Sequence, residues 1–144
     1  MAQINTNGLY RTFMFAPGNH ARKVEKVFDV GADAVILDLE DAVATNEKIA
    51  TRDFVAAALK APRGPLGYVR VNAYDTEFCY GDAVAIVGPW LDGVILPMVE
   101  SADQLRSFDW LLRNLERERE LPEGGIDLIP IIETGKGVAA LPEI

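Results

Sequence analysis

Short apolar runs alternate with segments of helical periodicity along this chain. The apolar runs predict five strands, at residues 12–16, 34–40, 66–72, 93–99 and 127–133. Apolar positions three and four residues apart predict helices at about 20–30, 45–61, 77–87 and 101–119, and a further helical stretch from 135. Asn19 is in position to cap the first helix, and Ser101 with Gln104 forms a capping-box pattern. Such strict alternation predicts right-handed βαβ units and a parallel sheet.

Two architectures are consistent with this alternation. One is a complete doubly wound α/β sheet of the flavodoxin type. The other is the first part of a TIM (β/α)8 barrel, which usually needs about 250 residues. Residues 137–144 have the pattern of a helix that has not ended. The pattern alone leaves both architectures open.

Composition narrows the class of protein. The 144 residues are 49% hydrophobic and 25% charged, which is ordinary for a globular protein and enough for one domain over residues 1–144. A net charge of −8 argues against nucleic acid or an anionic membrane surface as the partner. No apolar stretch approaches the roughly 20 residues of a membrane span, and the first residues show no signal-peptide pattern. We therefore expect a cytoplasmic protein that binds neither membrane nor nucleic acid.

Charged residues recur where the predicted strands end. Both architectures bind their ligands at the carboxyl ends of parallel strands. Four of the five predicted strands carry charge there, from Asp38, Glu40 and Asp41, from Arg70, from Glu100 and from Glu133. Acids scattered at random among loop starts explain this recurrence poorly, so the pattern predicts a ligand site at this edge.

The densest group of acids follows the apolar run that ends at Leu37. Asp38, Glu40 and Asp41 come directly after it. Unpaired carboxylates are costly to bury, so packing does not explain them. They are either solvated at an ordinary strand end, or they form a cluster at the mouth of the fold that holds a cation or a water molecule.

Arg70 lies between two valines in an otherwise apolar strand. Its guanidinium is always charged and has the planar geometry that suits a carboxylate. One interpretation is an internal ion pair with Asp38 or Glu40, and the other is a clamp for the carboxylate of a substrate. The two are compatible, because a partner could hold Arg70 until the substrate arrives.

Glu133 is a single carboxylate at the tip of the fifth strand, before Gly135. Sites with several carboxylate oxygens suit Mg²⁺ or Mn²⁺. The sequence has one cysteine and one histidine, so a zinc site is not expected. Arg22 and Lys26 are four residues apart and share a helix face, which is either solvated or a docking point for phosphates.

Several segments together resemble the citrate lyase β-subunit-like family of the HpcH/HpaI aldolases. They run in order along nearly the whole chain, at residues 13–19, 31–43, 69–72, 96–101 and 132–134. The Leu-Asp-Leu-Glu-Asp-Ala-Val segment at 37–43, combined with Arg70 and Glu133, is a specific signal. The resemblance implies a (β/α)8 barrel, of which this chain would be the N-terminal half with about five strands.

The resemblance also implies an activity. Family members cleave or form a carbon–carbon bond in acyl-CoA esters such as citramalyl-, malyl- or citryl-CoA, with Mg²⁺. The family roles that match positions in this sequence are an Mg²⁺ ligand at Glu133, an oxo-acid clamp at Arg70, acids that hold metal-bound water at Glu40 and Asp41, CoA contacts at Arg22 and Lys26, and a tyrosine position at Phe15. A homo-oligomer, either a trimer or a hexamer, of a longer chain is implied as well.

Two features depart from the family pattern. Met98 stands where many relatives have lysine, a position that bears on substrate choice. The family's second Mg²⁺ ligand is an aspartate on the next strand, and after Glu133 this sequence offers only Glu143, which lies in the wrong place. We expect the 144 residues to be part of a longer product, or to be completed by another chain. The alternative is a stand-alone α/β module that binds a ligand without catalysis.

Overall fold

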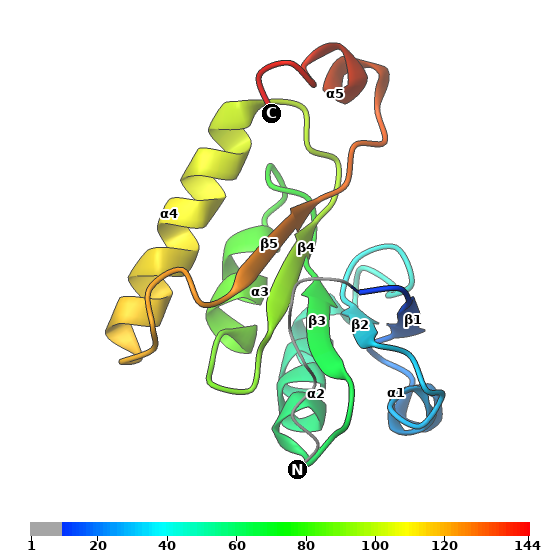
Figure 1. Ribbon diagram of the computed structural model, residues 1–144. Helices are drawn as coiled ribbons and strands as arrows, with labels where there is room; N and C mark the ends of the chain where they lie inside the picture. The colour runs from blue at the N-terminus through cyan, green and yellow to red at the C-terminus, as the bar shows by residue number, and fades with distance from the viewer. Residues whose placement is uncertain (1–9) are drawn as a thin grey trace.

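The computed structural model describes residues 10–144. Its strands are β1 (Phe13–Pro17), β2 (Ala34–Asp38), β3 (Leu66–Arg70), β4 (Gly93–Leu96) and β5 (Asp127–Pro130). Its helices are α1 (Ala21–Val27), α2 (Lys48–Lys60), α3 (Cys79–Ile86), α4 (Ala102–Glu118) and α5 (Gly135–Ala139) (Figure 1). The predicted alternation is confirmed, although most elements are shorter than predicted.

The segment in which no signal peptide is predicted lies mostly in residues 1–9, outside the described part. No helix within the described part is both long and apolar enough to cross a membrane.

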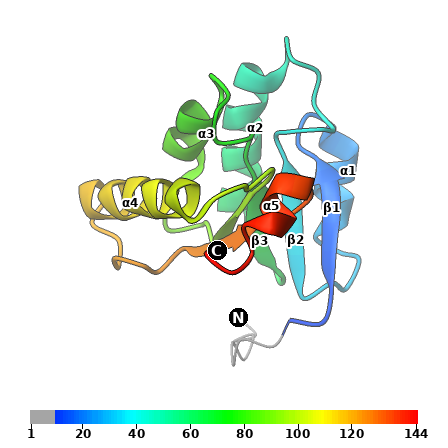
Figure 2. The same ribbon diagram turned by 90° about the horizontal axis from the view of Figure 1, so that it is seen from above.

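The strands pair in the order β1-β2-β3-β4-β5, and every neighbouring pair is parallel. A flavodoxin-type sheet has the order 2-1-3-4-5, with helices on both faces. Here α1 to α4 all lie on one face of the sheet (Figures 1 and 2). Sequential parallel strands with helices outside them are the arrangement of a (β/α)8 barrel. The strand order therefore decides between the two architectures that the sequence leaves open.

The alternation of side chains along each strand separates two apolar layers. The main core lies between the sheet and its helices, and it contains Val35 and Leu37 of β2 with Val69 of β3. A smaller cluster on the opposite face, which we call the inner face, is formed by Ala34, Ile36, Tyr68 and Ile95. Asp38 and Arg70 continue this second set of alternating positions, so both belong to the inner face.

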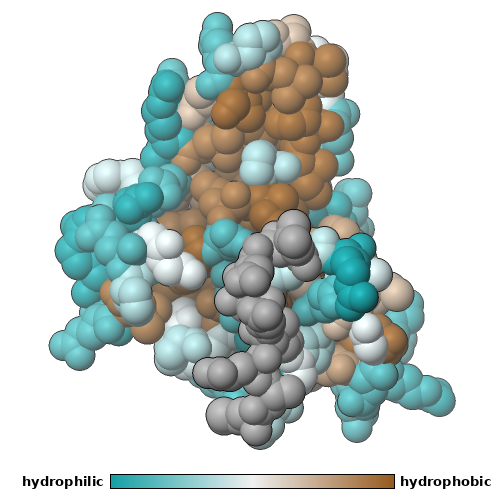
Figure 3. Space-filling model, viewed as in Figure 1, coloured by the Kyte–Doolittle hydropathy of each residue, from teal (hydrophilic) through white to brown (hydrophobic). Residues whose placement is uncertain are grey.

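Part of the inner face is apolar and uncovered. Figure 3 shows apolar residues gathered over the upper ends of β4 and β5 and over α5. Met98, Val138 and Leu141 are exposed, and Ile129 and Ile131 are half-buried. A closed barrel fills its interior with such side chains. The half-buried strand residues of this patch, Ile129 and Ile131, therefore lie at positions that line the interior of a closed barrel.

The helix ends test the two predicted caps. Ser101 Oγ accepts the N–H of Gln104 at 3.3 Å, and Gln104 Oε1 accepts the N–H of Glu100 at 2.7 Å, which confirms the Ser101 cap. The Asn19 cap is wrong, because α1 begins after His20 without a side-chain cap. Asn19 instead donates from Nδ2 to Glu47 Oε2 at 2.6 Å, a contact that orients its side chain toward the residue before α2.

Gly18 connects β1 to the edge where the charged residues gather. Its N–H donates to the carbonyl oxygen of Asp38 at 2.9 Å, and a Cβ at this position would lie 2.5 Å from that oxygen. We expect Gly18→Ala to lower the free energy of unfolding by about 2 kcal/mol, because overpacking forces the backbone apart. Gly64→Ala is the matched control, since a Cβ there meets nothing within 4 Å. Equal stability of the two variants in urea unfolding would contradict this close approach.

Candidate functional site

Arg70 and Asp38 form a closely matched ion pair at the carboxyl ends of β3 and β2. Arg70 Nε donates to Asp38 Oδ1 and Nη2 donates to Oδ2, each at 2.7 Å. Their side chains are 14% and 2% exposed, respectively. Paired strand positions bring the two residues together, because Asp38 lies opposite Arg70 in the parallel register. The internal ion pair predicted as one alternative for Arg70 is confirmed.

Asp38 is held ionised by several donors. It also accepts the backbone N–H groups of Glu40 at 2.9 Å and Ala42 at 3.0 Å. Burial by itself would raise the pKa of Asp38, but the hydrogen bonds from Arg70 and from these two N–H groups outweigh it and hold the pKa below its usual value. The same carboxylate therefore fixes both the guanidinium and the start of the turn that follows β2.

Glu40 is the second acid beside Arg70. Its Oε2 lies 3.2 Å from Arg70 Nη1. Burial raises the pKa of Glu40 above its usual value, and the nearby carboxylates of Asp41 and Asp38 add to this effect, although Arg70 opposes it. Asp41 itself is exposed. The structure thus brings two of the three predicted acids to Arg70 and leaves the third at the surface.

The guanidinium of Arg70 keeps one edge for a ligand. A guanidinium has five N–H groups, of which Asp38 takes one on Nε and one on Nη2, while Glu40 faces Nη1. One hydrogen of Nη1 and one of Nη2 point along the outer edge of any guanidinium, which is the geometry that binds a carboxylate through two parallel hydrogen bonds, and Asp38 does not use this edge. The ion pair and the substrate clamp are therefore geometrically compatible.

Phe15 covers this guanidinium from β1. Its ring centroid lies 5.1 Å from Arg70 Cζ, within the range of a cation–π contact. A hollow of about 260 Å³ opens here, lined by Phe15, Ala16, Pro17, Asp38, Ala42 and Arg70. Since a water molecule takes about 30 Å³, this space suits a small carboxylic acid. The predicted residues Phe15, Arg70 and Glu40 therefore meet at one place.

Glu133 lies at the same end of the sheet but has a different contact. It is exposed in the segment between β5 and α5, and its Oε1 accepts the N–H of Met98 at 2.9 Å. Met98 has a φ of 54°, in the left-handed region that non-glycine residues rarely adopt. Met98 adopts this conformation just after β4, where its N–H donates to the carboxylate of Glu133, which lies just after β5. Glu133 is thus anchored on β4 rather than on Arg70.

Arg22 and Lys26 are both exposed on α1, as their spacing predicts. Neither makes an ion pair with any of residues 10–144. The structure does not bring them into the hollow beside Arg70, whose lining comes from β1, β2, β3 and the turn after β2. They stay available on the helix that follows β1.

A buried polar network, which was not predicted, lies beneath the rim, by which we mean the carboxyl ends of the strands and the turns that follow them. Asp82 of α3 is fully buried, accepts Arg52 Nε at 2.7 Å and accepts Asn72 Nδ2 at 2.7 Å. Lys48 Nζ donates to the carbonyl oxygens of Leu39 and Glu40 at 3.1 and 2.6 Å. A buried role for Asp82 could have been inferred from the sequence, because Asp82 falls on the buried side of an apolar helix. No sequence pattern indicated the role of Lys48, since two of its acceptors are backbone oxygens eight and nine residues away and the third, Asn72 Oδ1, is 24 residues away.

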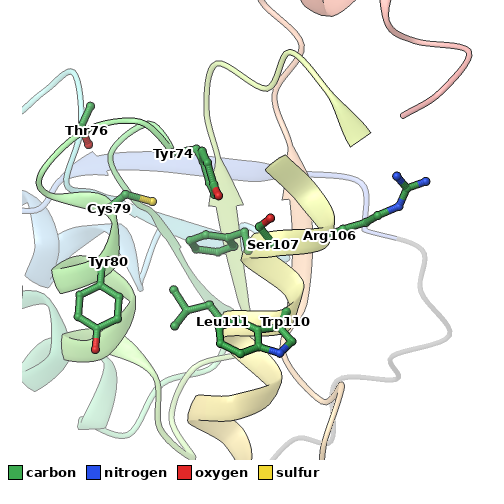
Figure 4. Close-up of a pocket in the computed structure, with 9 residues that line it drawn as sticks. Tyr74, Thr76, Cys79, Tyr80, Arg106, Ser107, Trp110 and Leu111 are labelled. Carbon is green, nitrogen blue, oxygen red and sulfur yellow. The ribbon is translucent and has the colours of Figure 1, made fainter. Parts of the chain in front are cut away.

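A larger hollow of about 650 Å³ lies between α3 and α4, on the helical side of the sheet (Figure 4). Tyr80 lines it from α3, Trp110 and Leu111 line it from α4, and Tyr74 lies in the segment before α3. Cys79 adjoins it, and burial raises the pKa of its thiol to about 12, which makes it a poor nucleophile. None of the predicted site residues lines this hollow, so the smaller one beside Arg70 is the candidate site.

The carboxylates at the rim could form part of a magnesium site. Mg²⁺ is commonly bound through one or two carboxylates and several water molecules. Glu133 offers one exposed carboxylate, and the Glu40–Asp41 turn offers acids that could bind the waters. Within residues 10–144, no three or more His, Cys, Asp or Glu side chains are grouped to hold a metal ion. The described chain can therefore supply one ligand, but not a complete set.

The lowered pKa of Asp38 predicts a loss of stability in acid. A carboxyl group whose pKa is depressed on folding stabilises the native state above its unfolded pKa of about 3.9, and this contribution is lost as the pH falls through the folded pKa. We expect the free energy of unfolding to fall below about pH 4 and to fall less in Asp38→Asn. Urea unfolding at pH 3 and 6 measures both slopes. The hydrogen bond from Arg11 also lowers the pKa of Asp33, but Asp33 is present in both proteins and therefore does not affect the difference between their slopes. Equal slopes would contradict the prediction.

Sequence comparisons give this geometry a family context. A model of the HpcH/HpaI aldolase/citrate lyase family matches residues 11–144. The citrate lyase subunit beta of Leuconostoc mesenteroides subsp. cremoris is 35% identical over 147 residues, covering 98% of this chain and 47% of that protein. A (3S)-malyl-CoA thioesterase of Cereibacter sphaeroides is 40% identical over 100 residues, covering 68% of this chain and 35% of that protein. The chain spans about half the length, or less, of these curated relatives.

Solved structures agree on the fold. The citrate lyase beta subunit of Mycobacterium tuberculosis, complexed with oxaloacetate and magnesium, has a TM-score of 0.66 at 31% identity, covering 92% of this chain and 51% of that one. A Haloferax volcanii malate synthase in a pyruvate/acetyl-CoA ternary complex has a TM-score of 0.85 at 19% identity, covering 95% of this chain and 43% of that one. The second likeness concerns the fold alone. Together they confirm the predicted part of a TIM-barrel fold.

Proposed function

The chain belongs to the HpcH/HpaI aldolase/citrate lyase family, and from this premise we propose that it forms part of a magnesium-dependent carbon–carbon lyase. Its substrate would be a 3-hydroxyacyl-CoA such as citramalyl-, malyl- or citryl-CoA, and its products an acyl-CoA and an α-oxo acid. One observation carries the proposal. Asp38 fixes the guanidinium of Arg70 through Nε and Nη2, and Arg70 lines a hollow that suits a small acid.

The proposed reaction is a retro-Claisen cleavage. The substrate hydroxyl loses its proton to a base, the carbon–carbon bond breaks, and the carbon that carried the hydroxyl becomes the oxo group of the acid. The electron pair of the broken bond passes to the thioester enolate, which then takes up a proton to give the acyl-CoA. Every atom of the substrate is recovered in the two products, and no oxidant or reductant is needed.

Arg70 would bind the carboxylate of the oxo-acid part through its Nη1 and Nη2 hydrogens. The ion pair with Asp38 fixes the guanidinium plane, and Phe15 covers one face of it. A ligand held by a prearranged guanidinium loses little further freedom on its way to the transition state. This role uses the edge of Arg70 that Asp38 does not bind.

Glu133 would hold the Mg²⁺ ion, and Glu40 and Asp41 would bind its water molecules. When bound, Mg²⁺ supplies a Lewis acid that polarises oxygens of the oxo acid. Arg22 and Lys26 would contact the phosphates of CoA, since both are exposed cations on the helix that follows β1. These five residues would act on one substrate, because an acyl-CoA has a thioester end near the metal and a phosphate-bearing end.

A second candidate is hydrolysis of the thioester bond. It is favoured by the 40% identity to a (3S)-malyl-CoA thioesterase, although that match covers only 68% of this chain. The two reactions differ in their products. The lyase gives an α-oxo acid and leaves the thioester intact, whereas the thioesterase gives free CoA thiol and a hydroxy acid.

One assay separates the possibilities. The complete gene product that contains residues 1–144 is incubated with malyl-, citryl- or citramalyl-CoA and Mg²⁺, and the oxo acid and free thiol are measured in parallel. We expect oxo acid without free thiol, and no product after chelation of the metal. Free thiol without oxo acid would support the second candidate. If neither forms, and Arg70→Ala binds oxo acids as well as the parent, the lyase proposal fails.

A further inference from the structure

Lys48 is the first residue of α2, and all three hydrogens of its ammonium have acceptors. Nζ donates to the carbonyl oxygen of Leu39 at 3.1 Å, to that of Glu40 at 2.6 Å and to Asn72 Oδ1 at 2.6 Å. Two of these acceptors belong to the backbone that carries the Glu40 side chain. Lys48 is therefore bound to the turn that follows β2 rather than to a mobile surface group.

The position of Lys48 is not explained by helix stability. The N-terminus of a helix carries partial positive charge, so a lysine in the first turn is electrostatically unfavourable there. The first turn of α2 contains no acidic residue, and the only acid directly at the helix start is the N-cap residue Glu47. The three hydrogen bonds to the rim are thus the physical reason for a cation at this place.

The network behind Lys48 is itself rigidly bound. Asn72 donates from Nδ2 to the carbonyl oxygen of Leu39 at 3.0 Å and to Asp82 Oδ2 at 2.7 Å. Its backbone N–H donates to the same Asp82 oxygen at 2.9 Å, and Arg52 Nε binds the other at 2.7 Å. Contacts therefore run from α3 through the end of β3 to the turn after β2, which ties the turn to the strand that carries Arg70.

We propose that Lys48 is a positioning residue, which fixes the Glu40–Asp41 turn and so sets the place of the Glu40 carboxylate beside Arg70. Asp38 holds this turn from the other side, because it accepts the N–H groups of Glu40 and Ala42. With both sides bound, the Glu40 carboxylate stays within 3.2 Å of Arg70. The consequence for the lyase reaction rests on the proposed function, whereas the effect on the turn does not.

Amide hydrogen exchange in the complete gene product tests the effect on the turn. Lys48→Met keeps the aliphatic stem but removes the donors, and we expect the amides of Glu40 and Ala42 to exchange about 10-fold faster or more. The amide of Ile36, inside β2, should keep its protection. Lys60→Met, at the other end of α2, is the matched control and should leave all three amides unchanged. Lys48→Arg keeps charge and donors and should restore most of the protection.

Steady-state kinetics with malyl-CoA test the effect on the reaction. Loss of a supporting contact behind a site typically costs about 10- to 100-fold in activity, so we expect Lys48→Met to lower kcat by that factor and KM to change by less than about threefold. A residue that only stabilises the fold would not change kcat in the fully folded protein. If Lys48→Met does not fold, Lys48→Gln replaces it in both experiments.

The outcomes separate this proposal from the proposed function. Unchanged exchange at Glu40 and Ala42 would overturn the role of Lys48, as would an equal loss of protection at Ile36. Faster exchange at the turn with unchanged kcat would overturn its role in the reaction. If the parent protein cleaves none of the three acyl-CoA substrates, the proposed function fails, and the exchange data still decide whether Lys48 positions the turn.

Discussion

Replacing Arg70 by alanine is expected to abolish oxo-acid binding and to destabilise the fold at the same time. Truncating one partner of a buried, hydrogen-bonded charge pair costs roughly 2–5 kcal/mol, and 3–4 kcal/mol corresponds to about 100- to 1000-fold in affinity. We expect an effect of that size on binding of oxaloacetate, measured by titration calorimetry in the presence of Mg²⁺. The same substitution leaves Asp38, whose side chain is 2% exposed, without its cation.

The loss of stability in Arg70→Ala comes from the carboxylate that remains. A buried charge deprived of its partner typically costs about 3–5 kcal/mol, because desolvation is no longer offset. The free energy of unfolding should fall by about 3 kcal/mol in urea titrations at pH 7. Arg113→Ala is the control, since Arg113 is paired with Asp109 at the surface, where a salt bridge contributes about 0–1 kcal/mol.

A double variant separates the two effects of Arg70. Adding Asp38→Asn to Arg70→Ala removes the orphaned charge and keeps an oxygen that can accept the N–H of Glu40 or Ala42. Stability should return in large part, whereas oxaloacetate binding should stay lost. Arg70→Lys should also bind weakly, because a lysine cannot make the two parallel hydrogen bonds of a guanidinium. Oxaloacetate binding by Arg70→Ala at parental affinity would remove Arg70 from the site.

The part of the site predicted from sequence is the part that follows from strand ends. Asp38 and Arg70 meet because both end neighbouring strands, and residues at paired positions of a parallel sheet lie close together. Periodicity gives the strands without their spatial order, so it could not choose between a barrel and a doubly wound sheet. That choice depended on which strands pair, which no local pattern in the chain records.

The unpredicted part consists of contacts between distant polar groups. Lys48 binds the carbonyl oxygen of Glu40, and Asn19 binds Glu47 instead of capping α1. Backbone oxygens are the same in every residue, so a sequence does not indicate which of them a lysine will bind. The start of α1 was mispredicted for a related reason, since the side chain expected to cap it is held by a residue 28 positions away in the sequence.

Glu133→Gln is expected to remove Mg²⁺-dependent binding while leaving the fold unchanged. A glutamine oxygen can still accept the N–H of Met98, and Glu133 is exposed, so the free energy of unfolding should change by less than about 0.5 kcal/mol. A neutral amide is a much weaker ligand than a carboxylate for a hard cation. Calorimetric titration of oxaloacetate with and without Mg²⁺ measures the difference, which should vanish in this variant.

Glu143→Gln is the matched control for the proposed metal ligand Glu133, because it neutralises another exposed acid that follows β5. If Glu143→Gln lost the Mg²⁺ effect and Glu133→Gln kept it, the position of the metal would have to be reassigned to α5 and the residues after it. Arg70 differs physically, because its pair with Asp38 makes it part of the folded core, whereas Glu133 is exposed and, among residues 10–144, accepts one hydrogen bond, from the N–H of Met98. Stability measurements should therefore distinguish the proposed carboxylate clamp Arg70, whose loss destabilises the fold, from the proposed metal ligand Glu133, whose loss does not.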